Sequence, residues 1–277
     1  MALIGVLTFS DGRDFVHRDL EQFERQVEDS LAGRLREAGH QVVRADQPIT
    51  SSDLASREGR RIQAANPDLV IFSLPVWAFP HFSMLAADAI SAPLLLFSSL
   101  QPQYPGMVGM LAAAGSLDQI GRRYGRAWGT IEEPEVWRRV EQHVHAGHAV
   151  TSLRGSVFGR FGGRPMGMYT AVANPDEWLP RFGVDVEEID QWEIVRRSDA
   201  VPASRARAGR EWLERHAGQV RYDGRFLTPE ILERQVRSYH ALRELIDEWH
   251  LDFSGIKGQP ELTTHFCTMD VTEAFLN

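Results

Sequence analysis

The chain has 277 residues, of which 43% are hydrophobic and 25% are charged, as is usual for soluble globular proteins. This length exceeds one typical domain and suits two. The net charge of −8 argues against a polyanion such as nucleic acid as a partner. We expect neither a secretion signal nor a membrane span, because the sequence has no basic-then-apolar N-terminus and no apolar run of about 18 residues. The single cysteine, Cys267, can form no disulfide within the chain, which favours a cytoplasmic location.

The first half of the chain alternates strand-like runs with segments of helical periodicity. Strands are predicted at 3–7, 41–44, 69–72 and 94–97, and helices at 16–35, 52–66, 82–90 and 135–150. A repeated strand–helix–strand order implies parallel strands joined by right-handed crossovers. We therefore predict a doubly wound, Rossmann-like α/β domain over residues 1–153.

A second domain of the same α/β class is predicted over residues 154–277. Its strands are expected at 155–161, 185–189 and 251–253, and its helices at 203–218, from Thr228 onward, and from 269. Thr228 is a good helix N-cap, and Pro229 suits the first helical position. The expected fold is thus α/β, with two doubly wound domains.

Two side chains of the first domain follow predicted strands directly. Arg13 lies in the turn after the first strand, which lacks a dinucleotide-binding glycine pattern but falls at the edge of the sheet where such folds bind ligands. It is either a contact for an anion or hydroxyl or an ordinary surface charge. Trp77 lies between two prolines after the third strand. Its ring either packs the loop or offers a flat apolar face to the C–H side of a sugar.

Two glycine-rich segments and a terminal helix carry the candidate chemistry of the second domain. The segment 158–170 allows sharp turns and close approach of the backbone to another surface. The segment 255–262 places an ammonium group, the amide of Gln259 and a carboxylate on one loop, and the terminal helix adds Asp270 and Glu273. Carboxylates near such a loop suit a hard divalent cation or acid–base catalysis, although solvated surface carboxylates explain them equally well.

Four segments of the chain resemble the L-fucose isomerase family and its L-arabinose isomerase relatives. They occur in the family's order, at 161–170, 182–190, 255–263 and 271–277, and the resemblance covers essentially the whole chain. The blocks Gly-Gly-Arg-x-Met-Gly and Lys-Gly-Gln-x-x-x-Thr are its most specific parts. The resemblance implies two α/β domains followed by a β-rich C-terminal domain. It also implies Mn²⁺-dependent interconversion of aldoses and ketoses through an enediol.

The resemblance assigns roles to four residues. Glu273 matches the family's glutamate that binds the metal and serves in proton transfer, so it is the expected catalytic residue and metal ligand. Gln259 matches a glutamine that contacts the substrate. Arg13 and Trp77 resemble first-domain residues that reach the site of a neighbouring subunit, so both are expected to bind substrate.

The resemblance also predicts what lies outside this sequence. The chain is expected to be truncated before the β-rich domain, which carries the aspartate and histidine that complete the Mn²⁺ site. We therefore expect the N-terminal part or subunit of an isomerase acting on a pentose or a (6-deoxy)hexose, inactive alone. Its expected partners are a monosaccharide, further copies of itself and a separate polypeptide carrying the C-terminal domain. The alternative is a non-catalytic sugar-binding or scaffold subunit of the same fold.

Overall fold

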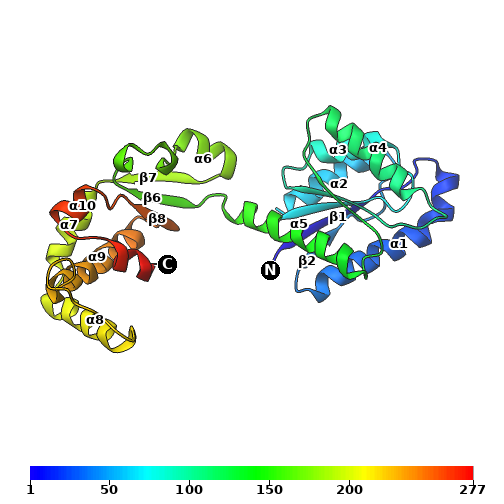
Figure 1. Ribbon diagram of the computed structural model, residues 1–277. Coiled ribbons are helices and arrows are strands. Elements are labelled where there is room, and N and C mark those ends of the chain that lie inside the picture. Colours follow the sequence, from blue (N-terminus) through cyan, green and yellow to red (C-terminus); the bar gives the residue numbers. More distant parts are fainter. Residues whose placement is uncertain (277) are drawn as a thin grey trace. The chain divides into compact units, whose positions relative to one another are not determined.

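The computed structural model describes residues 1–276 and divides the chain into two compact units. Unit 1 comprises Met1–Ser152, and unit 2 comprises Leu153–Asn277. Each unit has its own sheet (Figure 1). Each also has its own apolar core. No helix among residues 1–276 is both long and apolar enough to cross a membrane.

Unit 1 is built on a five-stranded sheet in which every neighbouring pair is parallel. The spatial order is β2-β1-β3-β4-β5, with strands β1 (Leu3–Thr8), β2 (Gln41–Arg44), β3 (Leu69–Ser73), β4 (Leu94–Ser98) and β5 (Gly125–Trp128). Strands β3 and β4 are buried along their whole length because helices cover both faces of the sheet.

The helices of unit 1 form one layer on each face of this sheet. One core cluster joins the sheet to α1 (Asp14–Glu37) and α5 (Pro134–Ser152). The other joins it to α2 (Ser52–Ala64), α3 (Pro80–Asp88) and α4 (Gly106–Gln119). The predicted doubly wound α/β fold of this half is confirmed.

Two elements of unit 1 have no counterpart among the predicted ones. Helix α4 is rich in glycine and alanine and has only a weak apolar stripe, so its periodicity gives no signal. Strand β5 has the sequence Gly-Arg-Ala-Trp and takes its conformation from pairing with β4. Tertiary contacts, and not local pattern, decide both elements.

Unit 2 has a smaller parallel sheet of order β7-β6-β8, formed by β6 (Val157–Phe161), β7 (Asp185–Ile189) and β8 (Phe253–Ile256). Its helices are α6 (Pro175–Phe182), α7 (Gln191–Ala200), α8 (Ala203–His216), α9 (Pro229–Glu248), α10 (Glu261–His265) and α11 (Asp270–Leu276). Two short 3₁₀ turns, Pro165–Gly167 and Tyr169–Ala171, lie in the glycine-rich segment after β6. The central strand has neighbours on both sides, as in a doubly wound sheet.

The core of unit 2 lies between the sheet and the helices that follow β7. Phe161, Ile194 and Leu242 are fully buried there. Thr228 caps α9 as predicted, since its hydroxyl accepts a hydrogen bond of 3.2 Å from the amide of Ile231. The strand expected at 251–253 instead begins at Phe253, because the residues after α9 form a turn in which the Leu251 amide donates to Ile246.

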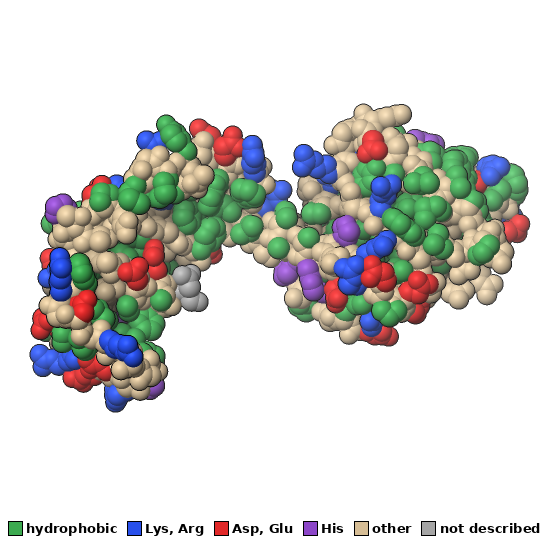
Figure 2. All heavy atoms as spheres, viewed as in Figure 1, with side chains coloured by type: hydrophobic (Ala, Val, Ile, Leu, Met, Phe, Trp, Pro, Cys, Tyr) green, Lys and Arg blue, Asp and Glu red, His purple; other side chains and the backbone are tan. Residues whose placement is uncertain are grey.

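Part of the surface of unit 2 near α6 is apolar. Figure 2 shows hydrophobic side chains gathered around β6, β8 and α6. Leu179, Phe182 and Phe253 are among those exposed by more than a third.

Candidate functional site

The turn after β1 holds Arg13 in a defined orientation. Its guanidinium makes two hydrogen bonds to Asp11, with Nε 2.9 Å from Oδ1 and Nη2 2.6 Å from Oδ2. Asp11 is buried, and its hydrogen bonds with Arg13 lower the pKa of the carboxyl. Half of the Arg13 side chain remains exposed. Arg13 is therefore anchored at the carboxyl edge of the sheet with donor groups still accessible.

Beneath the same turn lies a buried polar cluster that the sequence analysis missed. The hydroxyl of Ser10 lies 2.8 Å from Nδ1 of His17 and donates to the carboxyl of Glu24. Glu24 is fully buried, and desolvation raises its pKa to about 7. The sequence does contain a signal for this buried carboxyl. Glu24 falls within the apolar stripe of α1, between Leu20 and Val27, where a charged side chain is turned toward the core.

The loop after β3 carries Trp77 and is held tightly by α4. A Cβ at Gly106 would lie 2.5 Å from the carbonyl oxygen of Pro75, and one at Gly109 would lie 2.6 Å from that of Val76. Only glycine allows this close approach of helix and loop. Most of the loop is buried, whereas Trp77 is half-buried.

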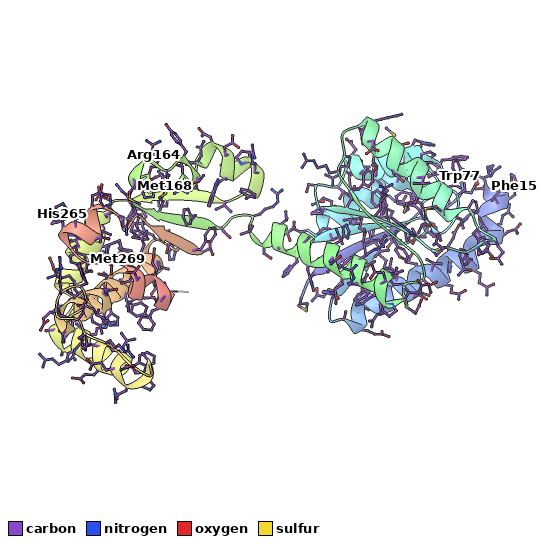
Figure 3. The ribbon with its side chains drawn as sticks, in the orientation of Figure 1. Phe15, Trp77, Arg164, Met168, His265 and Met269 are labelled. Atoms are coloured by element: carbon purple, nitrogen blue, oxygen red, sulfur yellow. The ribbon has the colours of Figure 1, made fainter. Side chains whose placement is uncertain are left out.

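The loops that carry Arg13 and Trp77 adjoin one another. A Cβ at Gly12 would lie 2.9 Å from the ring of Phe79, which belongs to the loop after β3. Figure 3 shows Phe15 and Trp77 toward the same end of unit 1. The structure thus places the two predicted residues of unit 1 on neighbouring loops at the carboxyl ends of β1 and β3, where ligands of such sheets bind.

The predicted loop of unit 2 follows β8 and is tied to the end of β6. The amide of Lys257 donates to Phe161 at 2.9 Å, and its ammonium group binds Glu261 at 2.7 Å. Gln259 is exposed on this loop. Beside it, a cavity of about 300 Å³ opens between the glycine-rich segment and β8, and its lining includes Arg160, Trp178 and Lys257.

Glu273 lies on α11 beside the outer edge of β8. It lines a cavity of about 500 Å³ together with Arg243, Ser254 and Ile256. Its carboxylate accepts a hydrogen bond from the backbone amide of Ile256. Successive amides of a strand point to opposite sides, and the amide of Lys257 donates to Phe161 of β6, so the amide of Ile256 points away from β6. Burial, and secondly the charge of Asp270, raise the pKa of Glu273.

The predicted residues of unit 2 do not converge on one cavity. Glu273 lines the cavity beside β8, whereas Gln259 lines neither that cavity nor the one at the glycine-rich segment. Within residues 1–276, no group of three or more His, Cys, Asp or Glu side chains is arranged to hold a metal ion. A divalent cation needs several oxygen or nitrogen ligands, so the described residues do not form a complete Mn²⁺ site.

Comparison with known proteins finds one matching family model and similar curated proteins. The family model described as L-fucose isomerase, first N-terminal domain, matches residues 1–155. A sulfoquinovose isomerase from Alkalicoccus urumqiensis is 22% identical over 201 residues, which cover 70% of this chain and 44% of that protein. A sulfoquinovose isomerase from Clostridium sp. (strain MSTE9) is 24% identical over 140 residues, or 48% of this chain and 31% of that protein. The matched part of this chain therefore spans less than half the length of these relatives.

Proposed function

Since the chain belongs to the L-fucose isomerase family, we propose that it is the N-terminal part of an aldose–ketose isomerase that acts through an enediol. The observation that carries the proposal is the family match over unit 1, where the anchored Arg13 and the half-buried Trp77 lie on adjoining loops. The proposed substrate is a pentose or a (6-deoxy)hexose. Because two relatives are sulfoquinovose isomerases, we add that sulfonated sugar to the candidates.

Arg13 and Trp77 are proposed to bind the sugar. A guanidinium whose orientation is set by Asp11 can donate hydrogen bonds to substrate hydroxyls with little loss of side-chain entropy. The indole of Trp77 offers an apolar face to the C–H side of the ring or chain. In this proposal both residues serve the site of a neighbouring subunit, so the active protein is a homo-oligomer.

Gln259 and Glu273 are proposed to act on the substrate and its proton. The amide of Gln259 both donates and accepts hydrogen bonds, which suits a sugar hydroxyl. Burial raises the pKa of Glu273, which makes its ionised carboxylate a stronger base for moving a proton between C1 and C2. Glu273 is also proposed as one ligand of Mn²⁺. The other ligands are proposed to come from the expected β-rich domain, because the described residues offer no complete set, and we derive no step that involves the metal.

The test is an assay for ketose formation from L-fucose, L-arabinose and sulfoquinovose with Mn²⁺ present. It is made first on the 277-residue chain, and then on this chain joined to or mixed with the polypeptide encoded directly downstream. We expect no activity from the chain alone and metal-dependent activity from the completed protein. Sugar binding without turnover in the completed protein would instead favour a sugar-binding or scaffold subunit.

A further inference from the structure

A cavity in unit 1 lies between α1 and the loops that follow β4 and β5. Its volume is about 140 Å³. Phe23 and Phe97 contribute apolar walls. Its polar side chains come from three separate segments of the chain and are Gln26, Ser30, Ser99, Gln101, Thr130 and Glu132. The cavity lies at the carboxyl ends of two parallel strands, which is where open α/β sheets bind ligands.

The polar side chains of this cavity are not used by the fold. Within residues 1–276, none of the six makes a hydrogen bond or ion pair with another protein group. Ser99 is the most informative, because it is only 8% exposed and its buried hydroxyl has no hydrogen-bond partner there. Native structures rarely leave a buried hydroxyl unsatisfied without a reason. A ligand hydroxyl that reached Ser99 would supply the missing partner.

The lining also defines the kind of ligand. No Lys, Arg or His side chain lines the cavity, so it does not suit an anion. Hydroxyl and amide groups both donate and accept hydrogen bonds, and the carboxylate of Glu132 accepts them, as the hydroxyls of a polyol require. The cavity of about 140 Å³ is smaller than the roughly 300–1,000 Å³ of sites for drug-sized ligands, which favours a short carbon chain.

We propose that this cavity binds short neutral polyols of about four carbons. An apolar wall with a few convergent polar groups is the usual composition of a small-molecule site. The proposal does not depend on isomerase activity, because Arg13, Trp77, Gln259 and Glu273 do not line the cavity.

The experiment is an NMR titration of the ¹⁵N-labelled 277-residue chain with erythritol, D-threitol and L-threitol. We expect saturable shifts of the amides of Ser99, Gln101 and Thr130 at millimolar concentrations, with different affinities for the three isomers. Fixed donors and acceptors distinguish stereoisomers, whereas the general exclusion of polyols from protein surfaces does not saturate. Shifts that rise linearly with concentration, or that are equal for all three isomers, would overturn the proposal.

Variants on α1 provide the second measurement. Ser30→Leu fills the cavity, and Gln26→Ala removes one amide at an exposed position where the fold is not at risk. Gln26→Ala should weaken polyol binding by about tenfold, the effect expected for a lost hydrogen bond to a fitted ligand. Ser30→Leu should weaken it at least as much, because the leucine side chain occupies the space of the ligand. Gln22→Ala is the matched control, since Gln22 is exposed one turn earlier on α1 and does not line the cavity. Equal affinity in Gln26→Ala and Gln22→Ala would contradict the assignment.

Discussion

The carboxyl of Glu24 lies against the imidazole of His17, with Oε2 3.2 Å from Nδ1, in the buried space beneath the turn that carries Arg13. Besides Ser10, which donates to the other carboxyl oxygen, four titratable groups act on Glu24 from its surroundings. They are His17, Asp11, Glu21 and Glu28. Desolvation outweighs the hydrogen bond from Ser10, so the carboxyl keeps its proton to about pH 7.

This burial predicts a pH dependence of folding stability. Between the ordinary pKa of 4.5 and the folded value of about 7, the folded state holds a proton that the unfolded state has lost. The free energy of unfolding therefore falls as pH rises through this range, by up to about 3 kcal/mol in total, and levels off above it. Glu24→Gln has no such proton, so we expect its stability relative to wild type to improve from pH 5 to pH 8.

Urea unfolding of both proteins at several pH values measures this difference. Comparing variant with wild type cancels the titration of the surrounding groups. Glu135→Gln on α5 is the control, because its hydrogen bond with Arg138 lowers the pKa of Glu135 and leaves that group ionised throughout the range, while Glu135 does not act on Glu24. Parallel stability curves for wild type and Glu24→Gln would show that Glu24 is ionised in the folded protein.

The contact between α4 and the Trp77 loop predicts opposite effects for two glycines of one helix. Gly109→Ala would push its methyl group to 2.6 Å from the carbonyl oxygen of Val76, so we expect a loss of about 1–3 kcal/mol in the free energy of unfolding. Gly115 faces open space, and Gly115→Ala should stabilise the chain by about 0.5–1 kcal/mol. Thermal unfolding measures both, and equal effects would mean that the close approach is absent in solution.

Arg13 depends on Asp11 for its orientation, and this predicts a graded loss of activity. In the completed protein, Arg13→Ala should lower kcat/KM by about 10–100-fold, as expected for a lost charge-assisted hydrogen bond. Asp11→Asn keeps the shape of the side chain but weakens its hold on the guanidinium, so a smaller loss is expected. Arg18→Ala, an exposed arginine on the following turn of α1, is the control and should leave kcat/KM unchanged.

Glu273→Gln separates a chemical role from a structural one. The amide oxygen of glutamine can still accept the hydrogen bond from Ile256, while the charge and the basic carboxylate are lost. If Glu273 transfers the proton, kcat of the completed protein should fall by about 10²–10⁴-fold, and Mn²⁺ affinity should fall as well. Near-normal turnover would indicate that the role of Glu273 is limited to accepting the hydrogen bond from the amide of Ile256 at the edge of β8. Gln259→Ala is the comparison, with a raised KM and unchanged metal affinity expected.

The proposal of a shared site predicts complementation between inactive variants. Arg13→Ala and Glu273→Gln proteins should each lose activity alone and regain part of it when mixed and reassembled, because some subunit interfaces then combine two intact halves. Trp77→Ala should complement Glu273→Gln in the same way. Kinetic assays on the mixtures, with sedimentation to verify assembly, provide the measurement. Activity that never exceeds the sum of the separate variants would show that the site is not shared.

Much of the fold could be predicted from local sequence pattern, because an element with strong periodicity is recognisable even where its predicted ends are a few residues off. The long stripe of α1 and the capped start of α9 are examples, and β3 and β4 are recognisable as short buried runs. Helix α4 and strand β5 could not be found this way, since their sequences have no clear period and their structure depends on packing against neighbours.

The candidate site also has features that local sequence pattern could predict and features that it could not. Chain order and parallel topology are enough to predict which residues follow the strands at the carboxyl edges, and Arg13 and Trp77 are among them. Three further features are visible only in the folded protein. Asp11 holds Arg13 by hydrogen bonds, Glu24 is buried beneath them, and Glu273 lies on the edge of β8 while Gln259 does not line its cavity. These facts depend on distances between segments far apart in the chain and on the desolvation of individual groups, which no local pattern encodes.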